Sequence, residues 1–275
     1  DIKAPYLVKG IQYEGLRKIG NPNDFALNYY RDNIDELYYE DIVASLYERN
    51  SLIDIIKSST RDIFIPITVG GGLRSIDDVA NVLRAGADKV AINTAAIKDP
   101  RIISDLSDRF GSSTIVLSIQ AKKNNDSWEA YYDNGREHSY KNVIDWIIEA
   151  EKLGAGEVCL ASVDMEGTGK GFDYDLIKAV TDKISIPVIA SGGMGNLEHL
   201  EKVILNSGAD AVAACHKGVP PVNTPERIAR LLLACPVSCA DVTPHCLPSP
   251  PLPSPTPSLP TPPPPLPPMP PPPPP

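Results

Sequence analysis

Two glycine-ended segments of the sequence could bind phosphate groups. The segment Ile65–Gly72 begins with Ile-Pro and ends in three glycines, and Ile186–Gly193 repeats the pattern 121 residues later. A short apolar run without alternation is typical of a strand buried on both faces of a parallel sheet. Glycines at the end of such a strand allow backbone N–H groups to approach an anion closely. The repeat therefore predicts two phosphate sites facing each other.

Polar residues at neighbouring strand ends would complete these sites. The first site would consist of Gly71, Gly72, Asn93 and Thr94. The second would consist of Ser191, Gly192 and Gly193, beside Ala213 and Ala214. Two such sites would hold a long, phosphorylated small molecule with a phosphate at each end. The alternative is that the glycines only allow strands and helices to pack closely.

Acid–base chemistry would come from two further strand ends. Asp1 and Gln120 are 119 residues apart, so we expect them on opposite sides of the site. Opposed carboxylates would suit general acid–base catalysis, but a glutamine side chain does not exchange protons near neutral pH. Asp41 also ends a strand, where it could support the site or only cap a turn. Lys9 begins a loop or hairpin, where it could reach a phosphate or remain solvated.

Three charged residues lie at the opposite ends of their strands. Glu36, Lys89 and Glu157 fall near the amino-terminal ends of the second, fourth and sixth predicted strands. They could be surface ion pairs of little energetic worth. They could also ring the bottom of a barrel as a gate.

The elements that must position these residues alternate between strand and helix, which predicts a parallel sheet. We predict helices over residues 21–33, 51–59, 77–85, 99–110, 141–153, 174–183 and 197–206. Further strands are predicted over residues 34–41, 88–94, 114–120, 157–163 and 209–214, with a hairpin over 127–140 that turns at Asn134-Gly135.

A second internal repeat favours a barrel over a doubly wound sheet. Gly86-Ala87-Asp88 recurs as Gly208-Ala209-Asp210 at nearly the offset of the glycine segments. We therefore predict an α/β fold, a (βα)8 TIM barrel built from two similar (βα)4 halves. Asp1-Ile2-Lys3 would be the end of a first strand whose beginning is absent.

Composition limits the class of protein. The 275-residue chain carries a net charge of −9, which argues against nucleic acid as a partner. There is no run of 18 apolar residues and no signal-peptide pattern, so we expect a cytoplasmic protein that does not cross a membrane. The five cysteines have no regular spacing, which indicates reduced thiols. We expect neither a metal nor a cofactor.

Three regions differ in composition. We expect residues 1–216 to form the barrel domain and residues 217–246 to match it poorly, although 225–234 could form a short helix. Residues 247–275 are almost only Pro, Ser, Leu and Thr, which predicts a disordered Pro-rich C-terminal tail. The middle region also contains Cys235, Cys239, His245 and Cys246, but their irregular spacing argues against a zinc site.

Seven motifs of the barrel region together resemble one known family. They are Asp1-Ile2-Lys3 with Leu7-Val8-Lys9-Gly10, Glu36 through Asp41-Ile42-Val43-Ala44-Ser45, Thr68-Val69-Gly70-Gly71-Gly72, Gly86-Ala87-Asp88-Lys89-Val90 with Asn93-Thr94-Ala95-Ala96, Gly154-Ala155-Gly156-Glu157, Asp164 through Gly167-Thr168, and Ile189-Ala190-Ser191-Gly192-Gly193 with Gly195-Asn196-Leu197-Glu198-His199. They cover residues 1 to about 214. The combination resembles the cyclase subunit of imidazole glycerol phosphate synthase, an enzyme of histidine biosynthesis.

The resemblance implies a lyase reaction and a partner. A glutaminase subunit would form a heterodimer on the N-terminal face of the barrel and release ammonia, which would pass through the barrel. At the other end, ammonia would attack a phosphoribulosyl-formimino-aminoimidazole carboxamide nucleotide. Cyclisation and cleavage would give imidazole glycerol phosphate and aminoimidazole carboxamide nucleotide.

The resemblance also implies roles for individual residues. Asp1 matches the catalytic acid or base of the family, Lys9 matches its loop lysine, and Asp41 matches a supporting carboxylate. Its phosphate ligands match Gly72, Asn93, Thr94 and Gly193. Three members of its ammonia gate match Glu36, Lys89 and Glu157, and the fourth, an arginine, would precede Asp1 and is not in this chain.

Several positions depart from the family pattern. Gln120 stands where the family has its second catalytic aspartate, Ala161 replaces a usual threonine, Glu166 replaces a usual aspartate, and the resemblance stops after Ala214. Gln120 keeps a second hypothesis open. In this hypothesis the chain belongs to a branch similar to the cyclase that channels ammonia to a sugar amidotransferase in surface-polysaccharide biosynthesis. Its cyclase activity would be reduced or absent. The predicted hairpin also resembles that branch. A third hypothesis is an inactive fragment.

Overall fold

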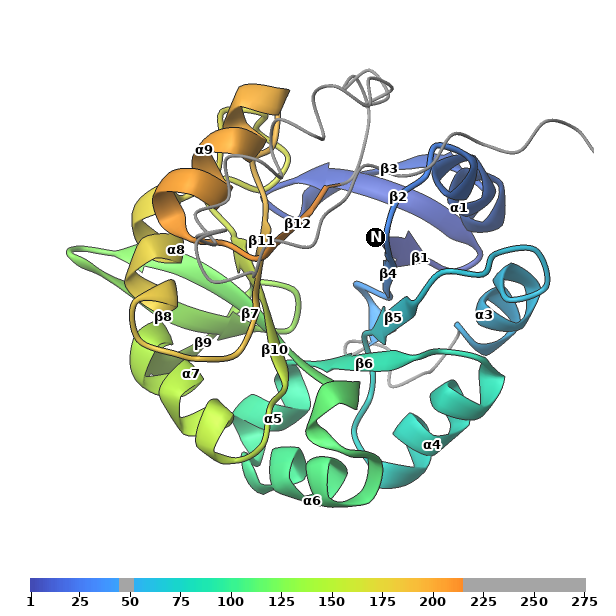
Figure 1. Cartoon of the computed structure of the whole chain (residues 1–275), viewed down its shortest axis with the longest axis horizontal. Coiled ribbons are helices and arrows are strands. Elements are labelled where there is room, and N and C mark those ends of the chain that lie inside the picture. The colour runs from blue at the N-terminus through green and yellow to red at the C-terminus, as the bar shows by residue number, and fades with distance from the viewer. Residues whose placement is uncertain (45–51, 215–275) are drawn as a thin grey trace, which may run out of the picture. The chain divides into compact units, whose positions relative to one another are not determined.

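The computed structural model describes residues 1–44 and 52–214 of the chain. In these residues a ring of strands is surrounded by helices (Figure 1). The ring strands are β4 (Leu37–Glu40), β5 (Ile67–Gly70), β6 (Lys89–Ile92), β7 (Ile115–Asn124), β10 (Glu157–Ser162), β11 (Val188–Ser191) and β12 (Ala211–Ala213). The helices are α1 (Pro22–Arg31), α3 (Ile53–Ser59), α4 (Ile76–Ala85), α5 (Thr94–Lys98), α6 (Arg101–Phe110), α7 (Val143–Lys152), α8 (Tyr174–Thr181) and α9 (Leu197–Ser207), with a 3₁₀ turn, η1, at Ser112–Thr114.

The ring strands pair in parallel in the order β12-β11-β10-β7-β6-β5-β4. At the β4 end, Ile2 of β1 (Ile2–Lys3) makes a parallel bridge to Asp41. The ring is therefore a nearly closed barrel, with β1 in the place of a first strand. The predicted (βα)8 barrel is confirmed. Residues 225–234, the Cys235–Cys246 cluster and the Pro-rich tail lie outside the described residues.

The two halves of the barrel repeat a backbone contact as well as a sequence. Asp88 Oδ2 accepts a hydrogen bond from the Ile67 N–H at 2.8 Å, and Asp210 Oδ2 accepts one from the Val188 N–H at 2.8 Å. In each half this bond ties the start of one strand to the start of its neighbour. The Gly-Ala-Asp repeat is thus a structural element of both (βα)4 halves.

The main core lies between the strands and the helices around them. Trp146, Ile103 and Leu106 of the helices and Ile115 and Leu117 of β7 are fully buried there. A smaller cluster fills the inside of the ring, where Ala91, Val116 and Cys159 meet. Because side chains alternate along a strand, each ring strand contributes to both layers.

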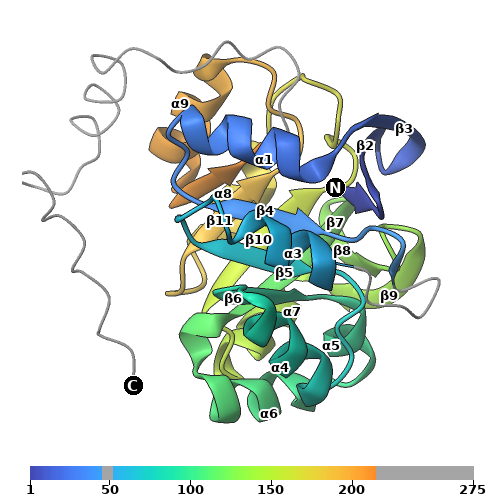
Figure 2. The same ribbon diagram turned by 90° about the vertical axis from the view of Figure 1, so that its right-hand side faces the viewer.

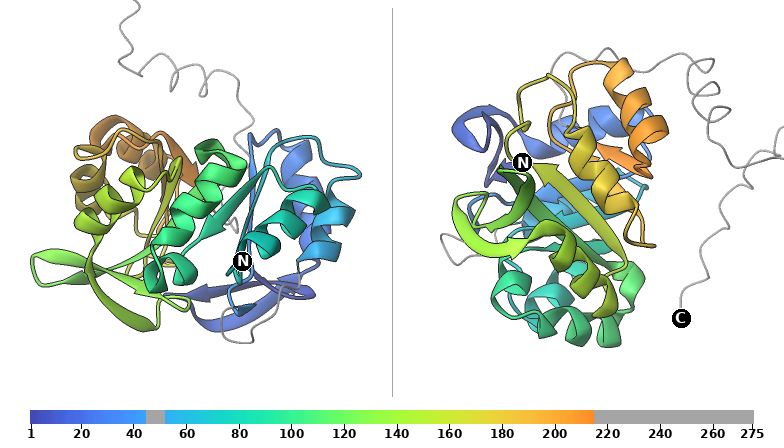
Figure 3. Two further views of the ribbon diagram at one scale, coloured as in Figure 1. Left: turned by 90° about the horizontal axis from the view of Figure 1, so that it is seen from below. Right: turned by 90° about the vertical axis from the view of Figure 1, so that its left-hand side faces the viewer.

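Two hairpins project from the same end of the barrel (Figures 2 and 3). The first consists of β2 (Tyr6–Ile11) and β3 (Glu14–Gly20). The second consists of β8 (Ser127–Tyr132) and β9 (Glu137–Asn142), and it pairs with an extension of β7 to Asn124. The second hairpin was predicted, and the first resolves the predicted loop or hairpin at Lys9 as a hairpin. Both stand at the end where the ring strands finish.

The main local difference from the prediction lies after β6. The strand predicted over residues 88–94 ends at Ile92, and Thr94 begins helix α5 instead. A five-residue helix is too short to show the 3.6-residue periodicity that reveals longer helices. No helix in the described ranges is long and apolar enough to cross a membrane.

The Gly-Ala-Asp repeat allows a matched test of the fold. Gly86 has a φ of 116°, and a Cβ there would lie 2.6 Å from Thr60 Cγ2. Gly208 has a φ of 74°, and its Cβ would lie 3.3 Å from Thr181 Oγ1. We expect Gly86→Ala to lower the free energy of unfolding by about 2–3 kcal/mol and Gly208→Ala by about 1 kcal/mol. Urea unfolding of both variants measures the difference, and equal losses would contradict it.

Candidate functional site

A cavity of about 130 Å³ lies at the carboxyl ends of β4, β5, β6 and β7. Its polar and glycine lining comprises Glu40, Asp41, Gly71, Gly72, Asn93, Thr94, Gln120 and Asn134, with Arg74 and Lys98 as the cationic side chains. The structure therefore brings together all four residues predicted for the first phosphate site. It also places Asp41 and Gln120 beside them.

The glycine at position 71 is required by a close approach of two strand ends. Gly71 has a φ of 93°, and a Cβ on it would lie 2.3 Å from the backbone oxygen of Asp41. The buried Asp41 side chain accepts a hydrogen bond from the Val43 N–H at 3.1 Å. Asp41 thus caps the turn after β4 and also lines the cavity.

Several buried polar atoms at this cavity have no hydrogen-bond partner in the part of the chain that the structure describes. Asn93 Nδ2 donates to the backbone oxygen of Tyr131 at 3.1 Å, but its Oδ1 has no partner among the described residues. The side-chain nitrogen and oxygen of Asn134 are both unpartnered as well. Buried polar groups are nearly always hydrogen-bonded in folded proteins. These atoms therefore indicate a site for water or a polar ligand.

Gln120 is held by the turn of the second hairpin. The Gly135 N–H donates to Gln120 Oε1 at 2.7 Å, and the Gln120 side chain is almost fully buried. Thr94 Oγ1 accepts from the Asp133 N–H at 3.2 Å in the same turn. The hairpin therefore closes one side of the cavity, and it fixes the orientation of the Gln120 amide.

Asp1 and Lys9 meet on the other side of the barrel end. Lys9 Nζ lies 3.8 Å from Asp1 Oδ2 and forms an ion pair with Glu166. The Gln12 N–H donates to the backbone oxygen of Glu166 at 2.9 Å. The first hairpin is therefore docked on the loop after β10. By strand order, Asp1 and Gln120 lie half a ring apart, as the sequence predicted.

The glycines of the second predicted phosphate site are closely packed against neighbouring backbone. A Cβ on Gly193 would lie 2.0 Å from the backbone oxygen of Gly171, and one on Gly192 would lie 2.9 Å from that of Ser162. The Gly171 N–H also donates to the Gly193 oxygen at 2.8 Å. These contacts fit the alternative that the glycines serve close packing. The first cavity does not include Ser191, Gly192 or Gly193.

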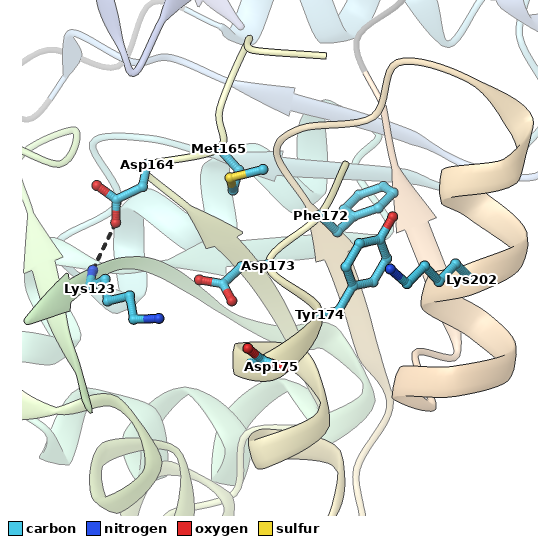
Figure 4. Close-up of a pocket in the computed structure, with 8 residues that line it drawn as sticks. All are labelled: Lys123, Asp164, Met165, Phe172, Asp173, Tyr174, Asp175 and Lys202. Atoms are coloured by element: carbon cyan, nitrogen blue, oxygen red, sulfur yellow. Dashed lines mark hydrogen bonds between the residues drawn. The ribbon is translucent and has the colours of Figure 1, made fainter. Parts of the chain in front are cut away.

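A second cavity, of about 500 Å³, lies between the β7–β8 extension, the loop after β10 and α8–α9 (Figure 4). Its lining includes Lys123, Asp164, Asp173, Tyr174 and Lys202. Its polar groups are largely engaged with each other, because the Lys123 N–H donates to Asp164 at 2.8 Å and the Lys202 ammonium lies 4.1 Å from the Tyr174 ring centroid. None of the residues predicted for catalysis or phosphate binding lines it.

The three predicted gate residues meet at the opposite end of the barrel. Lys89 Nζ lies 3.0 Å from Glu36 Oε2 and 2.7 Å from Glu157 Oε1. Thr68 Oγ1 donates a short hydrogen bond to Glu36. Partial burial lowers the pKa of Lys89, but its hydrogen bonds to both carboxylates outweigh this effect and raise the pKa. The cluster is therefore a partly buried network rather than isolated surface pairs.

Comparison with known proteins shows the family to which this chain belongs. A family model described as histidine biosynthesis protein matches residues 1–217. The chain belongs to this histidine biosynthesis family. It is 59% identical over 199 residues to imidazole glycerol phosphate synthase subunit HisF of Legionella pneumophila, which covers 72% of this chain and 94% of the relative.

Two further relatives of the family bear the same name. The subunit from Myxococcus xanthus is 41% identical over 233 residues, covering 84% of this chain and 92% of the relative. The subunit from Streptococcus mutans is 42% identical over 222 residues, covering 79% and 88%. The resemblance inferred from the motifs is thereby confirmed. The structure holds no group of three or more His, Cys, Asp and Glu side chains, in the residues it describes, that could bind a metal.

One titratable residue of the cavity was not recognised as a site residue from the sequence. Glu40 ends β4 directly before Asp41 and lines the cavity. Burial raises the pKa of Glu40 to about 7, and the nearby carboxylates of Glu166 and Asp41 add to the rise. The sequence signal that could have identified Glu40 was its spacing from Glu36 and Tyr38. Residues at every second position of a strand have their side chains on one face.

The raised pKa of Glu40 predicts a pH-dependent loss of stability. Below the ordinary glutamate pKa of 4.5, Glu40 is protonated in both the folded and unfolded states and carries no penalty. As pH rises through about 7, the folded protein must ionise a buried group that the unfolded chain ionises easily. Relative to Glu40→Gln, the unmodified protein should lose ~3 kcal/mol between pH 4.5 and 8.

Denaturant unfolding of both proteins across this pH range measures that difference. Subtracting the Glu40→Gln curve removes the contribution of all other titrating groups. Two parallel curves would show that Glu40 titrates in the folded protein as an ordinary exposed glutamate.

Proposed function

We propose that this chain is the cyclase subunit of an imidazole glycerol phosphate synthase. Ammonia from a glutaminase subunit reacts at the barrel end with phosphoribulosyl-formimino-aminoimidazole carboxamide nucleotide. The products are imidazole glycerol phosphate and aminoimidazole carboxamide nucleotide. The observation that carries this proposal is the meeting of Gly71, Gly72, Asn93 and Thr94 around one cavity at the carboxyl ends of the strands. This is the end at which barrel enzymes place their active sites.

The cavity offers what a phosphate needs. Gly71 and Gly72 supply backbone N–H groups at the end of a buried strand, while Arg74 and Lys98 supply positive charge. Asn93 Oδ1 and the side-chain amide of Asn134, which have no partner among the described residues, supply further polar atoms. In this proposal one phosphate of the substrate binds here, and the other binds across the barrel end near Ser191, Gly192 and Gly193.

The reacting part of the substrate then lies between the two phosphate sites. Asp1 is the acid or base on one side, and Lys9, 3.8 Å from it, balances its charge. The cluster of Glu36, Lys89 and Glu157 lies at the far end of the barrel. We assign it as the ammonia gate, and the glutaminase docks on the face that surrounds it.

Gln120 supports a second candidate function. Its amide is held by the Gly135 N–H and cannot exchange a proton, while Lys89 bonds to both Glu36 and Glu157 in the proposed gate. A protein that only conducts ammonia to a sugar amidotransferase needs the gate but not two acid–base residues. Turnover of the bis-phosphate nucleotide by the chain separates the two functions, because only the cyclase forms imidazole glycerol phosphate.

Asp1→Asn tests the catalytic assignment. With ammonia supplied directly, we expect the substitution to lower kcat by about 10²–10⁴-fold, since it removes an acid–base group while keeping the shape of the side chain. Formation of imidazole glycerol phosphate is the measurement. Asp105→Asn, at an exposed position of α6, is the control and should keep full activity. Equal activity of both variants would refute the role of Asp1.

Lys89→Met tests the gate. The substitution removes the cation that lies between the carboxylates of Glu36 and Glu157, about 3 Å from each. We expect turnover with added ammonia to be retained and turnover with glutamine and a glutaminase partner to fall. An equal loss of activity in both assays would show that Lys89 stabilises the barrel and does not act in ammonia transfer.

A further inference from the structure

The interior of the barrel contains a line of polar residues from one strand. Glu36 directly precedes β4, and Tyr38 and Glu40 follow it at every second position, so the three side chains share one face. Glu36 contacts Lys89 in the gate cluster, and Tyr38 packs against the cluster of Ala91, Val116 and Cys159 inside the ring. Glu40 therefore points into the barrel too, one step closer to the cavity.

Glu40 and Gln120 line the same cavity. The Glu40 side chain is partly exposed because it lines this cavity. No ion pair or hydrogen bond joins the Glu40 side chain to another described side chain. Its carboxyl group is thus free to meet a ligand in the cavity, whereas Gln120 Oε1 is held by the Gly135 N–H.

The charged and titratable groups around Glu40 keep it close to half-protonated at neutral pH. Its neighbours from the packed elements are the carboxylates of Asp41 and Glu166, the thiol of Cys159, and the phenols of Tyr13 and Tyr38. Lys9 is close as well, but it is paired with Glu166 and Asp1. The pKa of about 7 suits a group that gives and takes protons at neutral pH.

We propose that Glu40 is the proton donor of this active site and fills the role that the amide of Gln120 cannot perform. The inference rests on the proposed cyclase function and adds a residue to it. The geometry that supports it is the shared cavity, in which Glu40 and Gln120 approach the same ligand from β4 and β7.

In the first chemical step, Glu40 gives one proton and takes one back. The lone pair of ammonia forms a C–N bond to the carbonyl carbon of the ribulosyl arm, and the C=O π electrons move to the oxygen. Protonated Glu40 gives its proton to that oxygen. The resulting carboxylate then takes a proton from the new ammonium nitrogen. The product is a neutral carbinolamine, and Glu40 returns to its starting state.

The test uses the whole chain with added ammonia and the bis-phosphate nucleotide. Glu40→Gln should lower kcat by about 10²–10⁴-fold, while calorimetric binding of imidazole glycerol phosphate stays unchanged. Adding Gln120→Asp to that variant should restore kcat by about tenfold or more, because it returns a carboxyl group to the cavity. Glu151→Gln is the control, since Glu151 lies outside the cavity on α7 and bonds to Ser185.

The pH profile separates a chemical role from a structural one. With the rate expressed per unprotonated ammonia, kcat/KM of the unmodified protein should fall as pH rises through about 7, since protonated Glu40 is lost. The double variant should not show this fall at the same pH. Unchanged activity of Glu40→Gln, a loss of product binding, or a failure of Gln120→Asp to restore turnover would each overturn the role of Glu40. No turnover by the unmodified chain would overturn the cyclase function itself.

Discussion

The parallel register between neighbouring strands is the constraint on which the site depends. Glu40 pairs with Gly70, and Gly70 with Ala91, so β4, β5 and β6 finish at nearly the same level, beside the middle of the longer strand β7. Residues that follow these strands must then surround one space. The contact of Gly71 with the Asp41 backbone closes this arrangement so tightly that only a residue without a side chain fits.

The same register places charged side chains in two clusters, one at each end of the barrel. One end is closed by the partly buried network around Lys89, and the other contains the Asp1, Lys9 and Glu166 cluster. Charged groups are costly inside a protein unless they are paired, and both clusters meet that requirement with opposite charges. Glu40 is the exception, because it is buried near the carboxylates of Glu166 and Asp41. An unpaired group of this kind is often found where chemistry takes place.

The hairpin of β8 and β9 shows how an insertion can become part of a site. Its turn supplies the Gly135 N–H to Gln120, the Asp133 N–H to Thr94 and the buried side chain of Asn134 to the cavity. The Asn134-Gly135 turn signal predicted the hairpin correctly. It did not predict the contacts, because a turn motif determines local geometry and not where the hairpin lies on the barrel.

The sequence by itself determined the barrel, its two halves and the family, because strand–helix alternation and two repeats at one offset leave few other arrangements. It also grouped the residues of the proposed first phosphate site and those of the proposed gate, since residues at equivalent ends of parallel strands must gather. Only the tertiary structure decided that Lys9 pairs with Glu166, that the second glycine segment packs against Gly171, and that Glu40 shares a cavity with Gln120. Each of these depends on side-chain directions and loop paths, which long-range packing determines and local residue patterns do not encode.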